Sequence, residues 1–184
     1  MRWEALFDDF EAQLAEAARA GFEAEVRELV WAEQAGLSLM ERLRGHDGGT
    51  VDVVLRGGLR FAGLVREVAE SWFTLDAAPR SVLVPAPAVV AVSGLGRRSR
   101  QEHSRVRRAL SLGSALRALA RARAEVVCHA SGSGTEPIAV MGTIGAVGRD
   151  YAEVSSAPEE GWSVRRQATT LVPFGALVAV VSQG

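Results

Sequence analysis

Three segments of this chain occur twice in the same order, and this repetition constrains the fold more than any other feature of the sequence. The matching pairs are residues 37–44 with 110–117, 63–75 with 142–154, and 83–92 with 171–180. The last pair is identical at seven of ten positions, and the extra residues of the second copy fall in polar stretches that contain Gly and Pro. Loops tolerate insertions better than strands do. The repetition therefore predicts one folding unit that is built twice.

Each copy reads as a short helix followed by about five short strands. Ser38 and Glu41 form the S-x-x-E capping box that begins a helix, and Ser111 is placed to cap the matching helix of the second copy. The pair Gly57-Gly58 is typical of a tight hairpin turn between the first two strands. Both copies therefore predict the same order of elements.

Glycines and prolines mark the remaining bends of each copy. Gly63 and Gly142 lie inside predicted strands, which suits a strand that bends sharply. Pro85 and Pro173 have no backbone N–H group to donate to a strand ladder. We therefore expect these prolines at the turn between the last two strands of each copy, or on a sheet edge.

The first part of the chain reads as a separate long helix. Between Trp3 and Ala35, apolar side chains recur at spacings of three and four residues, which is typical of one apolar stripe on a helix. Gly21 allows a bend or a break in it. An unbroken helix of this length would span about 50 Å, which is longer than a small barrel can cover. We therefore expect self-association through this N-terminal helix.

The order of elements in each copy resembles the Sm-like family, which includes the Sm, LSm and Hfq proteins. The resemblance covers residues 37–92 and, more loosely, 110–180, and the whole is similar to a set of uncharacterised proteins from high-GC bacteria. It implies an α+β fold, in which a long N-terminal helix is followed by two Sm-like, SH3-like five-stranded small β-barrels, each preceded by a short helix. The implied limits are 1–36 for the long helix, 37–95 and 110–182 for the barrels with their leading helices, and 96–109 for a basic linker.

Members of the Sm-like family bind RNA, in part through a basic pair in the fourth strand. In this chain those positions carry Pro85-Ala86 and Pro173-Phe174, which do not predict the uridine pocket of the family. The resemblance therefore implies a fold and an association with RNA, but not the usual binding residues.

The charge of the chain is unevenly distributed, although its formal net charge is only -1. Residues 1–44 carry ten acids against five arginines, whereas residues 97–123 carry nine arginines against the single acid Glu102. The predicted nucleic-acid-binding residues are Arg97, Arg98, Arg100, Arg105, Arg107, Arg108, Arg117, Arg121 and Arg123. Such a cluster favours contacts with phosphates that weaken as salt rises. An alternative is that these arginines pair with the acidic N-terminal helix.

Aromatic side chains could add stacking surfaces for bases. Trp162 lies in a predicted insertion loop and is the stacking candidate, whereas Trp72 and Phe73 are more typical of a core.

The sequence contains no pattern that predicts catalysis, a metal site or a cofactor. His46, His103 and His129 are scattered, and neither C-x-x-C nor a phosphate-binding glycine loop occurs. The segment His46-Asp47-Gly48-Gly49 is typical of a loop that ends a helix. We therefore expect no enzymatic activity, no metal and no cofactor.

The sequence favours a cytoplasmic protein. The single Cys128 cannot form an internal disulfide, and its apolar neighbours predict a buried strand position. The longest apolar run, Leu171 to Val181, is about half of what a membrane span needs. The first residues lack the order of a secretion signal. We expect neither export nor a membrane partner.

Two functions are consistent with these observations. The first is a non-catalytic, Sm-like nucleic-acid-associated accessory protein, which binds RNA more readily than DNA and contacts phosphates through the arginines of residues 97–123. The second is a protein–protein interaction or scaffold module that self-associates through the N-terminal helix and the barrel edges.

Overall fold

The computed structural model describes most of the chain from residue 34 onward. The described residues are 16, 19, 22, 25–28, 30–32, 34–104, 107, 109–132, 136–156 and 168–183. The chain divides into two units, residues 1–38 and 39–184. In the first unit the described residues between 16 and 35 are helical, and most of the predicted helix over 1–36 lies outside the described residues. Within the described part, none of the helices has the length and apolar character needed to cross a membrane.

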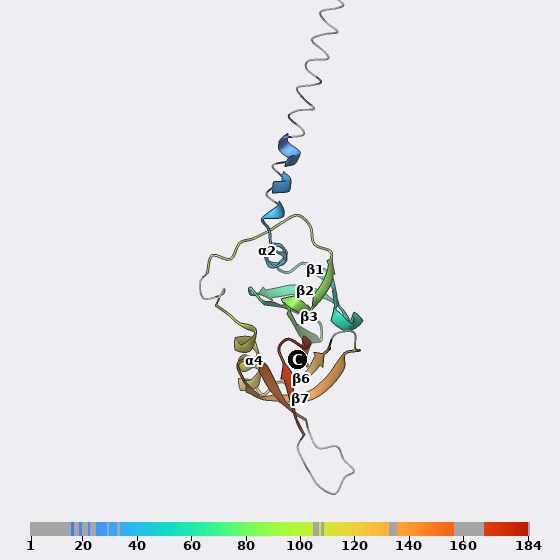
Figure 1. The fold of residues 1–184 in the computed structure, drawn as a ribbon, viewed down its shortest axis with the longest axis vertical. Coiled ribbons are helices and arrows are strands. Elements are labelled where there is room, and N and C mark those ends of the chain that lie inside the picture. The colour runs from blue at the N-terminus through green and yellow to red at the C-terminus, as the bar shows by residue number, and fades with distance from the viewer. Residues whose placement is uncertain are drawn as a thin grey trace, which may run out of the picture. The chain divides into compact units, whose positions relative to one another are not determined.

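The second unit is a small domain rich in β-strands (Figure 1). Its strands are β1 Thr50–Leu55, β2 Arg60–Val68, β3 Trp72–Ala77, β4 Arg80–Pro85, β5 Val89–Ser93, β6 Glu125–Ala130, β7 Ile138–Val147, β8 Tyr151–Ser155, β9 Thr169–Pro173 and β10 Leu177–Gln183. Its helices are α2 Leu39–Arg44 and α4 Leu112–Arg121, with short 3₁₀ turns at Arg56–Gly58 and Ala86–Ala88.

The ten strands form one continuous antiparallel sheet in the order β5-β1-β2-β3-β4-β10-β6-β7-β8-β9. The predicted α+β fold, with a long N-terminal helix and two five-stranded small β-barrels, is therefore wrong, because most of the structure is this single sheet with a few short helices. The physical reason is that β4 would otherwise expose unpaired backbone groups along its edge. Strand β10 pairs with that edge, with Leu83 opposite Val180 and Val82 opposite Val181.

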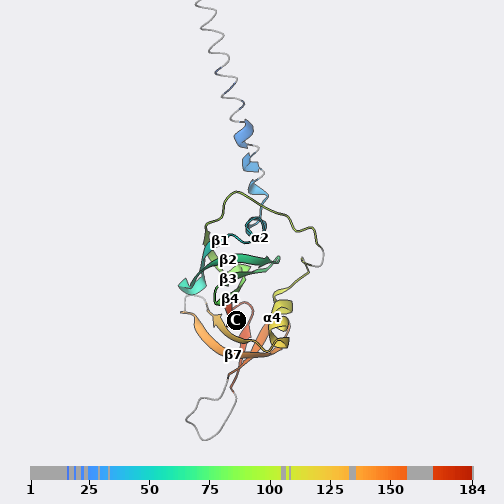
Figure 2. The same cartoon turned by 180° about the vertical axis from the view of Figure 1, so that it is seen from behind.

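The order of strands is the same on the two sides of the β4–β10 pair. The first five strands run β5-β1-β2-β3-β4 and the last five run β10-β6-β7-β8-β9, so that β10 holds the place among the last five that β5 holds among the first five. Figures 1 and 2 show the C-terminal end at the centre of the strands, between β1–β3 on one side and β7 on the other. The matching segments of the sequence thus occupy matching places in the sheet.

Two clusters of buried apolar side chains fill the interior, and each one includes residues from the other half of the sheet. The first cluster comes mainly from α2 and β1–β4 and is completed by Val178, Ala179 and Val181 of β10. The second comes mainly from α4 and β6–β10 and includes Trp72 and Leu83 of the first five strands. Each large apolar side chain that is fully buried contributes about 1.5–3 kcal/mol to stability. The two halves therefore depend on each other for a complete core.

Both short helices pack on the sheet through a fully buried leucine. Helix α2 contacts β2 and buries Leu43, and α4 contacts β7 and buries Leu116. The predicted cap of α4 is confirmed, because Ser111 Oγ accepts a hydrogen bond from the backbone N–H of Ser114 at 3.2 Å. This cap satisfies one of the backbone donors that a helix start leaves unpaired.

The predicted turn residues are also confirmed. Gly57 and Gly58 connect β1 to β2 with φ angles of 73° and 80°, a backbone conformation that residues with a Cβ atom rarely adopt. Pro85 ends β4 and Pro173 ends β9, in each case directly before the turn to the next strand. At these places the missing N–H group interrupts no ladder within a strand.

The two mid-strand glycines allow close approach of neighbouring strands, as the sequence predicts. A Cβ atom on Gly63 would lie 2.6 Å from the carbonyl oxygen of Asp76 in β3. A Cβ atom on Gly142 would collide with the carbonyl oxygen of Ser155 in β8. Figure 2 shows the curvature of β7, the strand that contains Gly142. Glycine at these two positions lets β2 and β7 bend around the core.

Candidate nucleic-acid interface

The structure describes seven of the nine predicted arginines, and all seven are exposed. Those described are Arg97, Arg98, Arg100, Arg107, Arg117, Arg121 and Arg123. Arg105 and Arg108 lie outside the described residues, as does the predicted stacking residue Trp162. The exposed arginines follow the chain from the end of β5, through the segment before α4, and along α4 itself. All seven side chains are therefore accessible from solvent.

The beginning of this arginine segment is held against α2 by its backbone. Arg42 Nη2 donates to the carbonyl oxygen of Gly96 at 2.6 Å, and the N–H of Arg100 donates to the carbonyl oxygen of Glu41 at 3.0 Å. A Cβ atom on Gly45 would lie 2.6 Å from the carbonyl oxygen of Arg98, so glycine at residue 45 permits this close packing. The backbone of residues 96–100 is thus anchored while its arginine side chains remain exposed.

His46 belongs to the same anchor and ends the helix, as its loop sequence predicts. Its Nε2 accepts a hydrogen bond from the N–H of Gly96 at 2.7 Å, and its Nδ1 lies 2.8 Å from the carbonyl oxygen of Arg42. Because Nε2 is an acceptor, we assign the ring proton to Nδ1, which then donates to Arg42. Both ring nitrogens are therefore engaged in structural hydrogen bonds.

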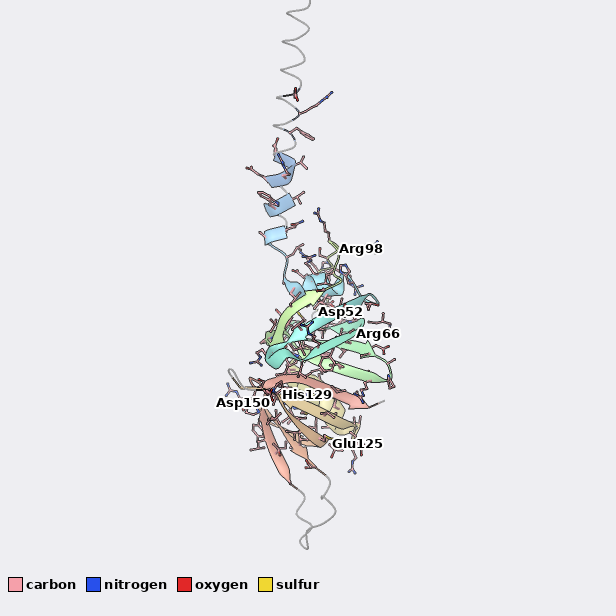
Figure 3. The ribbon with its side chains drawn as sticks, turned by 90° about the vertical axis from the view of Figure 1, so that its right-hand side faces the viewer. Asp52, Arg66, Arg98, Glu125, His129 and Asp150 are labelled. Atoms are coloured by element: carbon pink, nitrogen blue, oxygen red, sulfur yellow. The ribbon has the colours of Figure 1, made fainter. Side chains whose placement is uncertain are left out.

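A cleft of about 440 Å³ is lined by four arginines, of which two belong to the predicted segment. Arg100 and Arg107 line it together with Arg44 of α2 and Arg66 of β2. Three acids, Asp47, Glu67 and Glu102, share the same lining, so the positive charge is partly offset. Arg97 and Arg98 are not among the lining residues, so the predicted segment extends beyond the cleft. Figure 3 labels Arg98 and, on the strands, Arg66.

Arg44 is the buried cation of this cleft, with only 7% of its surface exposed. Its Nε donates to the carbonyl oxygen of Val68 at 3.2 Å and its Nη2 donates to that of Ala69 at 3.1 Å. Carbonyl oxygens satisfy the donors but do not neutralise the charge. The guanidinium therefore adds a fixed positive charge to the floor of the cleft.

Glu102 is the acid on which these arginines act. The N–H of Ser104 donates to Glu102 Oε1 at 2.8 Å, and this hydrogen bond lowers the pKa of the carboxyl below its ordinary value. Desolvation opposes this effect by raising the pKa, and the neighbouring cations Arg107, Arg44 and Arg100 each lower it by a smaller amount. The carboxylate of Glu102 is therefore stabilised first by the backbone of its own loop and second by the arginines of the cleft.

The ion pairs near the cleft are exposed and weak. Arg66 Nη2 lies 3.1 Å from Asp76 Oδ2, and Arg100 Nη2 lies 3.4 Å from Asp47 Oδ2. Pairs of this kind contribute about 0–1 kcal/mol and are screened by salt. Among the described residues, five exposed arginines of the segment have no hydrogen-bond or ion-pair partner for their side chains: Arg97, Arg98, Arg107, Arg121 and Arg123. The same is true of the exposed Arg60, Arg80 and Arg149, which lie outside the segment.

The aromatic residues near the cleft have structural places. Trp72 is 5% exposed and its indole Nε1 donates to the carbonyl oxygen of Leu110 at 3.1 Å. Phe73 is fully buried in the first cluster. The prediction that these two rings belong to the core is confirmed, and neither offers an exposed face for a base.

Other reactive side chains lie apart from the cleft. Cys128 is buried in β6, as predicted, and burial raises the pKa of its thiol to about 11. Burial also lowers the pKa of His129, whose ring contacts Phe61 edge to face with centroids 6.3 Å apart. Among the residues that the structure describes, His, Cys, Asp and Glu side chains form no group of three or more that could hold a metal ion.

Arg44 and Arg66 are the residues of the cleft that the sequence interpretation missed. Both lie outside the arginine-rich segment: Arg44 ends α2, against which residues 96–100 are held, and Arg66 lies in β2. The one signal for Arg44 is its place at the end of a predicted helix, directly after the core residue Leu43. No local pattern distinguishes Arg66 from the other exposed arginines of the strands.

Comparison with known proteins adds no family to this description. Neither a protein-family model nor a curated protein matches the chain, so the resemblance to the Sm-like family stays a prediction.

Proposed function

We propose that this chain is a non-catalytic, nucleic-acid-associated protein that contacts the phosphates of single-stranded RNA through the arginines of residues 97–123. The observation that carries the proposal is the concentration, in one segment, of exposed arginines without a side-chain partner in the described part of the chain: Arg97, Arg98, Arg107, Arg121 and Arg123. Guanidinium groups bind phosphate through paired hydrogen bonds. Exposed arginines without a competing carboxylate can do so at little cost.

The cleft extends this surface. Arg100 and Arg107 lie beside the buried charge of Arg44. The exposed pair between Arg100 and Asp47 is weak enough for a phosphate to compete with the carboxylate. The arginines Arg107, Arg44 and Arg100 contribute to the lowered pKa of Glu102, after the larger effect of the Ser104 N–H, so their positive charge acts on an anion in this cleft. A phosphate at the cleft mouth would meet the same cations.

The arrangement favours a flexible single strand over a duplex. The arginines follow the chain from the end of β5 to α4, and Figure 1 shows this path curving around the first five strands before it reaches α4. Duplex DNA is stiff over a length of about 50 nm, so it bends around a small protein only at an energetic cost. A single strand can follow a curved basic path with little strain.

A titration against salt tests this proposal. Fluorescently labelled single-stranded RNA and duplex DNA are titrated with the full chain at several salt concentrations. Each phosphate contact with a single strand contributes about -0.7 to the slope of log K against log salt. Replacing two arginines should therefore make the slope shallower by about 1.4. The test variants are the double substitutions Arg97→Ala/Arg98→Ala and Arg121→Ala/Arg123→Ala.

The matched control removes the same charge elsewhere. Arg60 in β2 and Arg80 in β4 are exposed arginines outside the segment. The double variant Arg60→Ala/Arg80→Ala should leave the slope for RNA unchanged. No binding at low salt, a slope near zero, or equal weakening by the control and the test variants would contradict the proposal. Tighter binding to the duplex would overturn the preference for RNA.

A further inference from the structure

The two outer strands of the sheet have edges that no described residue pairs with. In the described part of the chain, β5 pairs only with β1, and β9 pairs only with β8. Proteins commonly protect such edges with charged residues or distortions that prevent pairing with another chain. Neither β5, with the sequence VVAVS, nor β9, with the sequence TTLVP, contains a charged residue. Both edges therefore offer backbone groups for pairing, up to Pro173 at the end of β9, which has no N–H to donate.

The pairing of β4 with β10 within the sheet shows how such edges can fit together. Residues 83–92, which contain the second half of β4 and most of β5, match residues 171–180, which contain parts of β9 and β10. Strand β9 is thus the counterpart of β4, and β5 is the counterpart of β10. Strands β4 and β10 pair inside one chain. Their counterparts, β9 of one chain and β5 of another, can therefore pair in the same way.

Matching residues are buried in the inner strands β4 and β10 but exposed in the outer strands β9 and β5, which lack a neighbour on one side. Leu83 of β4 is 6% exposed at the internal pair, whereas its counterpart Leu171 of β9 is 59% exposed. Val178 of β10 is fully buried, whereas its counterpart Val90 of β5 is 65% exposed. These are the same residue types at matching places in the two halves. What differs is the presence of a neighbouring strand.

A groove with both apolar side chains and the charged Arg42 in its lining lies beside the β5 edge. It measures about 330 Å³ and is lined mainly by Leu39 of α2, by Leu95 and by residues of β5. Leu112 of α4 is the counterpart of Leu39 in the second half of the chain. It packs against the second cluster, which includes Trp72 and Leu83 of the first half. The residues of β8 and β9 that correspond to this tryptophan and leucine are Tyr151 and Leu171.

We propose that a second copy of this chain pairs its β9 with β5 of the first, antiparallel, and inserts Leu171 into the groove beside β5. The register follows from the internal pair, in which Val180 faces Leu83 and Val181 faces Val82. Transferred to the matching residues, Val92 of one chain faces Leu171 of the next, and Ser93 faces Thr170. The contact buries both outer edges and both exposed apolar side chains.

This contact joins different surfaces of the two copies. Each chain supplies one β5 edge and one β9 edge, so chains assemble head to tail and form a closed ring or an open fibre according to the rotation between copies. The contact involves strands rather than the arginines of residues 97–123. Its failure would therefore leave the proposed binding of RNA intact, and the reverse also holds.

Sedimentation velocity of the full chain tests the proposal. The protein is treated with nuclease and measured over a wide concentration range at high salt, which prevents bridging by RNA. Wild type should form species larger than a monomer. Val90→Glu and Leu171→Glu place a charge at positions that are exposed in the single chain, so each variant should fold and stay monomeric. Met141→Glu is the matched control, since Met141 is 63% exposed on the inner strand β7.

Mixing the two edge variants gives the sharpest result. Val90→Glu retains an intact β9 edge, and Leu171→Glu retains an intact β5 edge. An equal mixture should therefore produce a one-to-one dimer that cannot grow further, although each variant alone stays monomeric. A monomeric wild type, association that survives both variants, or a mixture that stays monomeric would overturn the proposal.

A cross-link tests the register without a charged substitution. A chain with Ser93→Cys is mixed with a chain with Thr170→Cys under mild oxidation, and a mixed disulfide dimer should form. The native Cys128 should not compete, because burial raises its pKa to about 11 and keeps it protonated. Mixing Ser93→Cys with Thr143→Cys, on the inner strand β7, should give no dimer. Equal cross-linking in both mixtures would refute the register.

Discussion

At the scale of single residues, Arg44 shows how a charged side chain can be structural and electrostatic at once. Arg44 is the last residue of α2, and its buried guanidinium donates to the carbonyl oxygens of Val68 and Ala69 at the end of β2. The same group adds positive charge to the cleft and lowers the pKa of Glu102. Stability and binding should therefore respond together when it is replaced.

Replacement of Arg44 by alanine should destabilise the fold. The variant leaves the carbonyl oxygens of Val68 and Ala69 without donors, which should lower the free energy of unfolding by about 3 kcal/mol. Urea unfolding followed by circular dichroism measures the loss. The exposed Arg60→Ala serves as the control and should stay within about 0.5 kcal/mol of wild type. A loss no larger than that of the control would contradict the structural role.

Close packing of strands at Gly63 makes a second prediction at this scale. A Cβ atom there would lie 2.6 Å from the carbonyl oxygen of Asp76, so Gly63→Ala should cost about 2–3 kcal/mol in unfolding free energy. Gly175 lies in the turn before β10, where an added Cβ atom meets nothing within 4 Å. Gly175→Ala should therefore leave the denaturation midpoint nearly unchanged. Equal effects of the two substitutions would argue against a packed strand at residue 63.

Cys128 should make stability fall at alkaline pH. Burial raises the pKa of its thiol from the ordinary value of 9.0 to about 11. Below pH 9 the thiol is protonated in both folded and unfolded chains, so its contribution is fully present. Between these values only the unfolded chain loses the proton, and stability should decrease by up to about 1.4 kcal/mol per pH unit.

The measurement compares urea unfolding of wild type and Cys128→Ala at pH 8 and pH 10. The alanine variant is less stable at both values because it leaves a cavity. It should nevertheless lose less stability than wild type as pH rises. An identical decrease in the two proteins would show that other groups cause the effect.

At the scale of elements, the helix cap of α4 offers a direct test of a sequence prediction. Ser111→Ala removes the acceptor for the N–H of Ser114 and should cost about 1 kcal/mol in unfolding free energy. Ser111→Asp keeps an acceptor oxygen and should recover most of the loss. Thermal unfolding followed by circular dichroism compares the three proteins. If the aspartate variant behaves like alanine, the hydrogen bond is not the source of the stability.

Local elements could be predicted because their signals lie within a few residues of one another. Ser111 caps the helix that begins at the next residue, Gly57 and Gly58 fill a turn, and Pro85 ends a strand. The cleft could be predicted only in part. Arg100 and Arg107 belong to an obvious run of charge, whereas Arg44 and Arg66 reach the cleft through contacts between distant segments.

At the scale of the whole molecule, the prediction of two separate barrels was wrong because β4 pairs with β10 and joins the strands into one sheet. The apolar pattern of β4 indicates a strand but does not specify which strand covers its second edge. In the structure that strand is β10, which follows it by many residues in the chain. Repetition in the sequence identifies matching elements, but the joining of the two sets into one sheet depends on long-range pairing that no local pattern encodes.

The central position of β10 predicts the pattern of hydrogen exchange. Amides of β4 and β10 should exchange most slowly in dilute protein, because both strands are paired on each side and their side chains enter both clusters. Amides of β5 and β9 should exchange faster. Mass spectrometry of exchanged peptides measures the difference, with β2 as an inner strand for reference. Fast exchange in β10 would contradict a continuous sheet.

The late position of β10 in the chain has a consequence for synthesis on the ribosome. Residues that form β1–β4 emerge well before Val178, Ala179 and Val181, the three β10 residues that complete their cluster. Until translation passes residue 181, the nascent first half has an uncovered core and an unsatisfied β4 edge. The order in which the strands are made therefore leaves the first half prone to association with other chains until β10 has been added.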